Sequence, residues 1–175
     1  MSRALRALGV LPLLLLAACA GYGGRGLVVG ESGVDDVRRL MGVPAQEWTD
    51  PDGSRQLAYP RGPAGVHTYM AHFAPNGRLR AFGNVLEPAT FARIRAGMGK
   101  DEVLRLLGPS RADWTVYFER RDELALEWRF CDEWNQLARF AVLFDASTGI
   151  VRSTLIQRES QVATIGENTS YWCAR

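Results

Sequence analysis

The chain has few of the residues that most often carry catalysis or bind metals. Its 175 residues include two histidines, His67 and His72, and three cysteines. It contains no phosphate-binding loop, no dinucleotide-binding glycine pattern and no zinc-ligand spacing. The histidines are five apart in a segment with the pattern of a strand, where odd spacing sends side chains to opposite faces. We therefore expect no metal, no resident cofactor and no enzymatic activity.

The sequence also lacks an excess of charge of one sign. It has 21 basic and 19 acidic side chains, and removal of residues 1–18, which contain two arginines, leaves equal numbers. Nucleic-acid binding needs a concentrated basic face, so we expect no nucleic-acid partner. The composition does not match the low hydrophobicity and high net charge of disordered chains, so the rest of the chain can bury a core.

The longest apolar run, Ala7–Ala18, is too short to cross a membrane. A spanning helix takes about 20 apolar residues. The run follows two arginines, Arg3 and Arg6, and ends in small residues. This is the pattern of a secretory signal peptide, so we expect residues 1–18 to be removed.

A cysteine at the end of such a run is not expected at an ordinary cleavage site. Leu16-Ala17-Ala18-Cys19 resembles a bacterial lipobox. The resemblance implies cleavage between Ala18 and Cys19, diacylglycerol on the Cys19 thiol and a fatty-acyl chain such as palmitate on the freed amine. Two or three chains anchor stably, since each buried methylene contributes about 0.8 kcal/mol. The alternative is an apolar leader that happens to contain a cysteine.

The residues after Cys19 indicate where such an anchor would hold the protein. Ala20 and Gly21 follow it, without an aspartate, which resembles the sorting signal for the outer membrane. We therefore expect the protein at the periplasmic face of the outer membrane. The glycine-rich residues that follow predict that 19–26 form a flexible, lipidated tether.

Beyond the tether, two segments of the chain are similar. "GESGVDDVRRLMGVP" from Gly30 matches "GMGKDEVLRLLGPS" from Gly97, and "FAPNGRLR" from Phe73 matches "FDASTGIVR" from Phe144. A tryptophan stands six residues after the closing glycine in both copies. Repetition of this kind predicts two copies of one supersecondary unit, over residues 27–86 and 87–175.

Each unit has the pattern of a short helix followed by antiparallel strands, which places the chain in the α+β class. In the first, Ser32 is the predicted cap of a helix over Asp36–Met41, and Gly42 ends it. In the second, the pattern predicts a helix over Pro88–Ala96 and another over Asp101–Leu107. The predicted strands are 57–60, 66–74, 78–83, 115–120, 124–131, 138–144 and 150–158.

This order of glycine, helix, glycine and proline before strands resembles the SmpA/OmlA (BamE-like) lipoproteins. Gly97-Met98, Asp101-Glu102-Val103 and Leu106-Leu107-Gly108-Pro109 match the family pattern well, and Gly30 to Pro44 matches it fairly. The resemblance covers most of residues 27–157. It implies a small α+β fold and an outer-membrane lipoprotein that assists the machinery for folding β-barrel proteins. The chain departs from the family in having two copies.

Two functions follow from the resemblance. One is a non-catalytic, protein-binding scaffold in β-barrel assembly or envelope maintenance, with a periplasmic or outer-membrane protein, such as a component of the assembly machinery, as partner. The alternative is a membrane-tethered inhibitor of a periplasmic enzyme, because tandem units of this architecture also resemble the β-lactamase-inhibitory proteins, which bind enzymes through a concave sheet.

Aromatic and arginine side chains crowd the second unit, and these residue types dominate binding hot spots. Trp134 lies among polar residues in a predicted turn and is the best candidate for an exposed aromatic; Arg129 and Tyr117 complete the candidate binding surface. The alternative for Trp114 and Trp128 is that they fill a small core.

With Cys19 acylated, Cys131 and Cys173 remain as an even pair in an oxidising compartment. Such a pair predicts a disulfide that holds the C-terminal segment. The alternative is a buried free Cys131.

Overall fold

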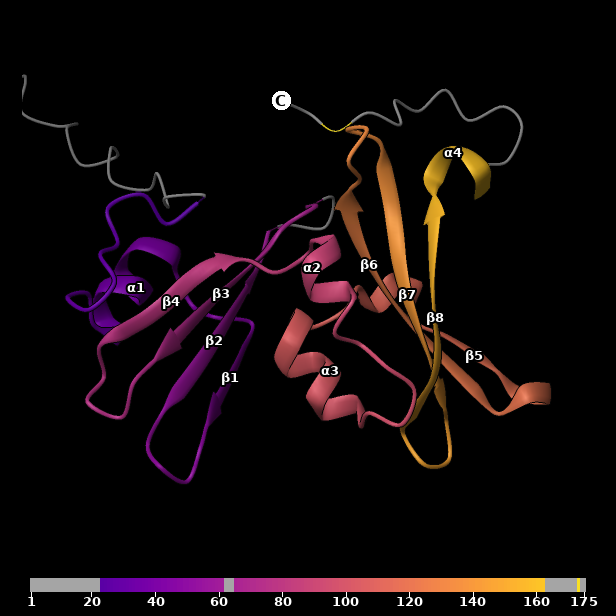
Figure 1. The fold of residues 1–175 in the computed structure, drawn as a ribbon, viewed down its shortest axis with the longest axis horizontal. Helices are drawn as coiled ribbons and strands as arrows, with labels where there is room; N and C mark the ends of the chain where they lie inside the picture. Colours follow the sequence, from indigo (N-terminus) through magenta and orange to yellow (C-terminus); the bar gives the residue numbers. More distant parts are fainter. Residues whose placement is uncertain (1–22, 62–64, 163–172, 174–175) are drawn as a thin grey trace, which may run out of the picture.

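The computed structural model of the protein describes residues 23–61, 65–162 and 173, and shows an α+β fold (Figure 1). Its main elements are two four-stranded antiparallel sheets and a few short helices. The first sheet contains β1 (Gln46–Thr49), β2 (Arg55–Pro60), β3 (Thr68–Phe73) and β4 (Leu79–Asn84). The second contains β5 (Val116–Phe118), β6 (Glu123–Cys131), β7 (Leu137–Asp145) and β8 (Ile150–Arg158). In both sheets the strands lie in chain order.

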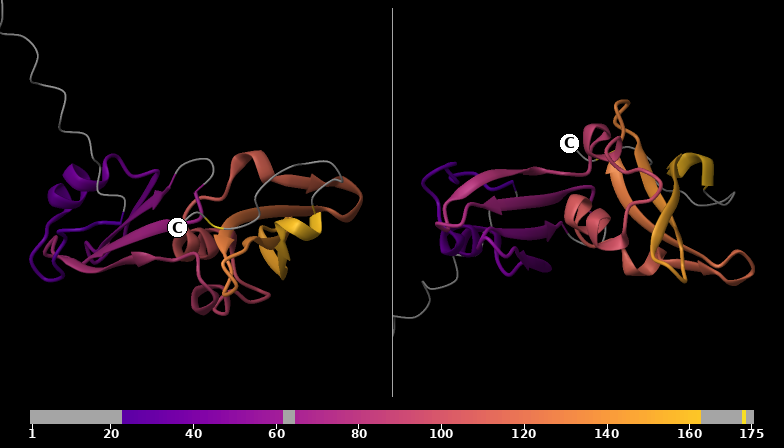
Figure 2. Two further views of the ribbon diagram at one scale, coloured as in Figure 1. Left: turned by 90° about the horizontal axis from the view of Figure 1, so that it is seen from above. Right: turned by 60° about the horizontal axis from the view of Figure 1, so that its bottom comes forward.

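The helices are short and lie between or beside the sheets. They are α1 (Val34–Met41), α2 (Pro88–Phe91), α3 (Lys100–Leu107) and α4 (Glu159–Val162), with 3₁₀ turns η1 (Ala112–Trp114) and η2 (Glu119–Arg121). An eight-residue helix, α1 or α3, precedes each sheet. Figure 2 shows α3 between the two sheets.

The two eight-residue helices begin in the same way. The backbone N–H of Gly33 donates to the Asp36 carboxylate at 2.8 Å, and the N–H of Gly99 donates to the Glu102 carboxylate at 2.7 Å. Each acid lies in the first helical turn, where the helix dipole also favours negative charge. Ser32, the predicted cap, accepts instead from the Val28 N–H at 2.9 Å, so that prediction was wrong.

The segments before these helices pair with the last strands in the same way. The Leu79 N–H donates to the Ser32 carbonyl and the Val151 N–H to the Met98 carbonyl, both at 2.8 Å. Isolated bridges join Gly33 to Arg78 and Gly99 to Ile150. Both sheets also have a register irregularity between their last two strands, at His72/Phe73 and at Leu143/Phe144.

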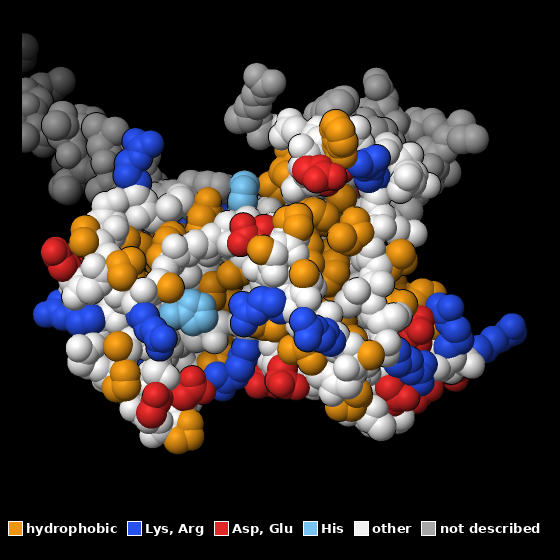
Figure 3. Space-filling model, viewed as in Figure 1, with side chains coloured by type: hydrophobic (Ala, Val, Ile, Leu, Met, Phe, Trp, Pro, Cys, Tyr) orange, Lys and Arg blue, Asp and Glu red, His pale blue; other side chains and the backbone are white. Residues whose placement is uncertain are grey.

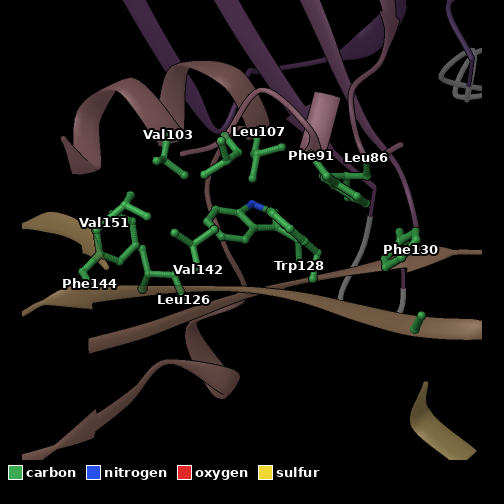
Figure 4. Close-up of a cluster of buried hydrophobic side chains, with 13 residues drawn as sticks. Leu86, Phe91, Val103, Leu107, Leu126, Trp128, Phe130, Val142, Phe144 and Val151 are labelled. Carbon is green, nitrogen blue, oxygen red and sulfur yellow. The ribbon is translucent and has the colours of Figure 1, made fainter. Parts of the chain in front are cut away.

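Each sheet has its own core against its own helix. In the first, Val37 and Met41 of α1 pack on apolar side chains of β2, β3 and β4. In the second, Val103 and Leu107 of α3 face Trp128 and its neighbours (Figure 4). The Trp128 indole N–H donates to the Gly108 carbonyl at 3.1 Å, which satisfies a polar group at the end of α3.

Several predicted elements differ from the structure. The helix expected over Pro88–Ala96 ends at Phe91, because Arg93 and Ile94 donate to carbonyls three residues back and the chain continues in turns. Strand β1 was not predicted. Strand β3 begins at Thr68, so His67 precedes it.

The glycine-rich segment is partly folded. Gly24 is buried, and a Cβ there would lie 2.3 Å from the Phe82 ring. The Leu27 N–H donates to the Gly24 carbonyl at 3.1 Å, and Leu27 packs against the first core. Of the predicted tether, residues 23–26 therefore belong to the folded body, and residues 19–22 lie outside the described residues.

Candidate functional site: the open side of the second sheet

The first sheet is covered on both faces. Its second face, formed by Trp48, Ala58 and Met70, packs against Leu104 of α3. Gly108, which ends α3, lies so close to β3 that a Cβ there would be 2.8 Å from the Thr68 methyl group.

Polar contacts fasten α3 to the first sheet. The Trp48 indole N–H donates to Asp101 at 3.3 Å, and Arg105 donates to Asp50 at 2.7 Å. The Gln56 side-chain amide donates to the Arg105 carbonyl. The helix of the second half thus completes the first sheet.

Among the described residues, no eight-residue helix covers the corresponding face of the second sheet. Leu126, Trp128 and Phe130 face α3, so the odd-numbered residues of β6 face away from it. We call this side, with its cross-strand neighbours, the outer face. It includes Val116, Phe118, Ala125, Glu127, Arg129, Arg139, Ala141, Leu143 and Leu155. Of the helices in the described part of the chain, only the single turn α4 follows β8, and it contacts β7 and β8.

Apolar side chains on the outer face are accessible to solvent. Val116 is 41%, Phe118 40% and Leu155 43% exposed. They come from both edge strands, β5 and β8, with the buried Ala125 and Ala141 between them. The strands are spaced by about 4.8 Å, so one partner element about 10 Å wide contacts residues of several strands at once.

The charges on the outer face are paired with one another. Arg129 donates to both oxygens of Glu159 at 2.8 and 2.5 Å. Arg139 lies 3.5 Å from Glu127 and 3.4 Å from Glu159. These groups already neutralise each other, so the face suits a largely apolar partner.

Trp114 also lies on this side and not in the core, which was the alternative for it. Its ring lies between the guanidinium groups of Arg111 and Arg139, each 3.9 Å from the ring centre. This is a cation–π arrangement, which holds the half-buried indole against the sheet. Trp128 is 2% exposed and fills the core, so the alternative holds for this tryptophan.

The three residues predicted as a binding surface lie on different parts of the second half. Trp134 is 63% exposed in the β6–β7 turn, Arg129 is on the outer face, and Tyr117 is on β5 opposite Leu124, on the opposite face. Cys131, where β6 ends before the turn that contains Trp134, is seven residues after Leu124, which corresponds to about 23 Å along the strand. The structure therefore does not bring Trp134 and Tyr117 together. Val116, Phe118 and Leu155 were not predicted from the sequence. For Leu155 a signal was present, because β8 lacks the clear apolar–polar alternation of a half-buried strand.

A groove of about 470 Å³ lies between the first sheet and the α2–α3 region. His72 lines it beside Arg93 and Arg105, and Figure 3 shows basic side chains around a histidine on this face. Burial lowers the pKa of His72, and Arg80 and Arg93 lower it further. His72 is thus neutral at pH 7, and Arg105 is already paired with two carboxylates.

No arrangement in the described residues supports metal binding. No group of three or more His, Cys, Asp or Glu side chains in this part of the chain has metal-binding geometry. Among the carboxylates at the β5–β6 end, Asp122 accepts from the Tyr117 hydroxyl at 3.1 Å and Glu123 lies 2.9 Å from Arg121. These acids have structural partners.

Cys131 and Cys173 form a disulfide, with their Cα atoms 6.0 Å apart. The Cys173 N–H donates to the Asn135 carbonyl at 3.0 Å, so residue 173 is held at the β6–β7 end of the second sheet. Ala18 and Cys19, the predicted cleavage and lipidation site, lie outside the described residues. No helix of the described part is long and apolar enough to span a membrane.

Comparison with protein-family models, curated proteins and solved structures found no match to this chain.

Proposed function

We propose that the protein is a lipid-anchored, non-catalytic binding module of the outer membrane that presents the outer face of its second sheet to a protein partner. The observation that carries the binding role is the exposed Val116, Phe118 and Leu155 on a face whose charges are already paired. Exposed apolar patches of this kind mark interaction sites in soluble domains.

The anchor in this proposal rests on the leader and on Leu16-Ala17-Ala18-Cys19. The folded body begins by Gly24, five residues after Cys19. Five extended residues reach at most about 18 Å. An acylated Cys19 would therefore keep the body close to the membrane surface.

The role in β-barrel assembly or envelope maintenance rests on the BamE-like sequence pattern. The matching helix caps, bridges and register irregularities of the two halves support their origin as two copies of one unit. The outer face would then be the surface through which the second copy meets its partner.

Membrane fractionation tests the anchor. Cys19→Ser should release the protein from the outer-membrane fraction or stop its processing, whereas Ser32→Ala, a change within the folded body, should leave both unchanged. Unchanged mass and partitioning of the Cys19 variant would contradict anchoring.

Cross-linking in intact cells tests the partner. A photo-reactive residue at position 155 should capture a periplasmic or outer-membrane protein, and one at position 35, exposed on α1, serves as the control. Capture of β-barrel assembly components supports the scaffold role, and capture of a hydrolase would support the inhibitor instead. Equal capture from both positions would contradict a binding role for the outer face.

A further inference from the structure

The four edge strands of the two sheets differ in length. They are β1 with four residues, β4 with six, β5 with three and β8 with nine. An edge strand presents unpaired backbone N–H and C=O groups, and proteins usually protect such edges by keeping them short or by covering them. β5 is short and lies between η1 and η2. β8, with nine residues, is the longest of the four edge strands and is not protected by shortness.

Only the start of β8 is paired on its free side. Gly99 bridges to Ile150, and the Val151 carbonyl and N–H bond to Gly97 and Met98. From Arg152 to Arg158, the only strand that pairs with β8 in the described part of the chain is β7. Residues 152–157 are all exposed. This open window is about 20 Å long.

The open window is apolar on both faces of the sheet. Leu155 lies opposite Ala141 on the outer face and is 43% exposed. Ile156 lies opposite the core residue Phe140 and is 52% exposed. On this second side, Figure 3 shows hydrophobic side chains gathered beside α2 over the strands of the second sheet. Residues added next to β8 would cover both side chains.

The two charged residues of β8 are already paired: Arg152 begins the window, and Arg158 directly follows its end. Arg152 contacts Asp145 at 2.6 Å, and Arg158 contacts Asp132 at 2.8 Å. The window contains no lysine or proline, the residues that commonly prevent strand addition. Its middle, Ser153 to Gln157, is uncharged.

We propose that the free edge of β8 receives an extended segment of a partner protein as a fifth strand of the second sheet. This rests on the protein-binding role proposed above and assigns the mode of binding. Backbone hydrogen bonds along residues 152–157 supply affinity, and side chains next to Leu155 and Ile156 supply selectivity.

A second copy of this chain fits the edge poorly. Two β8 strands related by a twofold axis would pair antiparallel. Directly opposite residues share a face of the sheet, so the axis must pass through a residue that lies opposite its own copy. Centred on Thr154, the partner copy's residues 157 and 158 would lie opposite 151 and 150, where Gly97 to Gly99 already pair. Centred on Leu155, Arg152 would face Arg158 twice, and like charges directly opposite destabilise a sheet. A segment without a folded body at its ends avoids both conflicts.

The window also defines the chemistry of the segment. It needs about six residues in extended form, without proline, and with β-branched or aromatic side chains. Two consecutive apolar residues would lie next to Leu155 and Ile156, one on each face. No compensating charge is required, because Arg152 and Arg158 are paired within the protein.

The probe for the test is a labelled peptide with the β7 sequence, LARFAVLFD, flanked by lysines for solubility. This sequence already pairs antiparallel with β8 from its other side, with Ala141 opposite Leu155 and Phe140 opposite Ile156. We expect saturable binding, measured by fluorescence anisotropy, to the full protein purified from membranes and held in lipid nanodiscs.

Matched variants test whether binding is at the open window. Leu155→Lys and Ile156→Lys should each weaken binding at least tenfold. Ile150→Lys, at a position 38% exposed on the paired part of the same strand, should leave it within twofold. All three substitutions are at exposed sites, and thermal unfolding checks that each variant remains folded. Equal weakening by all three, or by none, would overturn the proposal.

Backbone-methylated peptides test strand pairing itself. N-methyl groups on one set of alternate residues should abolish binding, because those N–H groups point at β8, whereas the other set should bind like the parent peptide. Equal binding by both sets would mean simple apolar adhesion and would overturn the proposal. So would a dimer of the protein, detected by light scattering, that the peptide cannot dissociate. Membrane fractionation and cross-linking in cells test the anchored binding role without the peptide. A protein that is anchored and captures a partner but does not pair with the peptide would therefore contradict the edge proposal alone.

Discussion

The helices that precede the two sheets have the same caps, and the same bridges join them to the last strands. In the described residues, however, helices cover both faces of the first sheet and only one face of the second. The first sheet has α1 on one face and α3 on the other. The second has α2 and α3 on one face and, on the other, exposed apolar side chains with an open edge at β8. The difference arises because α3 serves both halves, whereas in the described chain no further eight-residue helix follows β8.

Corresponding positions in the two halves illustrate this asymmetry. Tyr59 of β2 and Trp128 of β6 occupy equivalent positions in the two sheets. In β2, Arg55 pairs with Phe73, and Tyr59 lies four residues after Arg55. In β6, Leu124 pairs with Phe144, and Trp128 lies four residues after Leu124. Trp128 donates its N–H to the end of α3, but the buried Tyr59 hydroxyl has no hydrogen-bond partner among the described residues. The same location therefore stabilises the two halves differently, and the following predictions test that comparison.

The largest effect is expected at Trp128. Trp128→Ala removes a side chain that is 2% exposed and leaves the Gly108 carbonyl without its donor. We expect a loss of about 3–5 kcal/mol in the free energy of unfolding, measured by chemical denaturation. Trp134→Ala, at a 63% exposed site, is the control and should change stability by less than about 0.5 kcal/mol. Similar losses for both variants would contradict this description of the core.

Alanine substitution at the glycines that end α1 and α3 should lower the stability of the protein by different amounts. Gly42 and Gly108 have φ values of 87° and 74° with extended ψ, a backbone region open essentially to glycine alone, so alanine is strained at both by about 1–3 kcal/mol. No atom lies within 4 Å of a Cβ at Gly42, whereas a Cβ at Gly108 would meet the Thr68 methyl at 2.8 Å. We expect Gly108→Ala to cost about 1–3 kcal/mol more than Gly42→Ala, because overpacking adds to the strain. Equal losses in parallel denaturation curves would mean that α3 and the first sheet are less tightly packed than described.

The disulfide should stabilise the second half. Replacing both Cys131 and Cys173 by serine opens a cross-link between residues 42 apart in sequence. Removal of a cross-link over such a loop should cost about 2–4 kcal/mol. Hydrogen exchange should show the loss of protection concentrated at the β6–β7 end and not in β1–β4. Uniform loss across both sheets would contradict a local effect.

The smallest effect at neutral pH is expected at Tyr59. Tyr59→Phe removes a buried hydroxyl that has no partner among the described residues, so the free energy of unfolding at pH 7 should be unchanged or slightly higher. Its pH dependence is more diagnostic. Burial raises the pKa of Tyr59 from 10.0 to about 12, so the folded state favours the neutral phenol. That contribution is complete below pH 10 and is lost as the pH rises towards 12.

The comparison of wild type with Tyr59→Phe isolates this titration. The wild type should lose more stability than the variant between pH 10 and 12, as measured by denaturation at each pH. Identical pH profiles would show that the hydroxyl is solvated in the folded protein.

Local sequence features predicted much of the secondary structure. The segment 150–158 was predicted with the same bounds as β8, and Gly42 and Gly108 mark the ends of α1 and α3 as expected from their position before proline. These features depend on neighbours in sequence: glycine at positive φ ends a helix, and short turn sequences join strands. The helix predicted over Pro88–Ala96 was too long, because after Phe91 the chain continues in turns in which Arg93 and Ile94 donate to carbonyls three residues back.

The candidate site was harder to predict, because it depends on what covers each face. Trp114 and Trp128 have the same residue type, but one lies between two arginines on the outer face and the other fills the core. Strand β1 was missed because its four residues form a strand only by pairing with β2.

By itself, the sequence determined the apolar run that ends at Leu16-Ala17-Ala18-Cys19, the similarity of the two halves, the main strands and the cysteine pair. Each of these depends on residue type, spacing or count. Only the tertiary structure decided that α3 covers both sheets, and that Val116, Phe118, Leu155 and the edge of β8 remain open. Exposure is the result of packing between segments far apart in sequence, and no local pattern records which surfaces lack a neighbour.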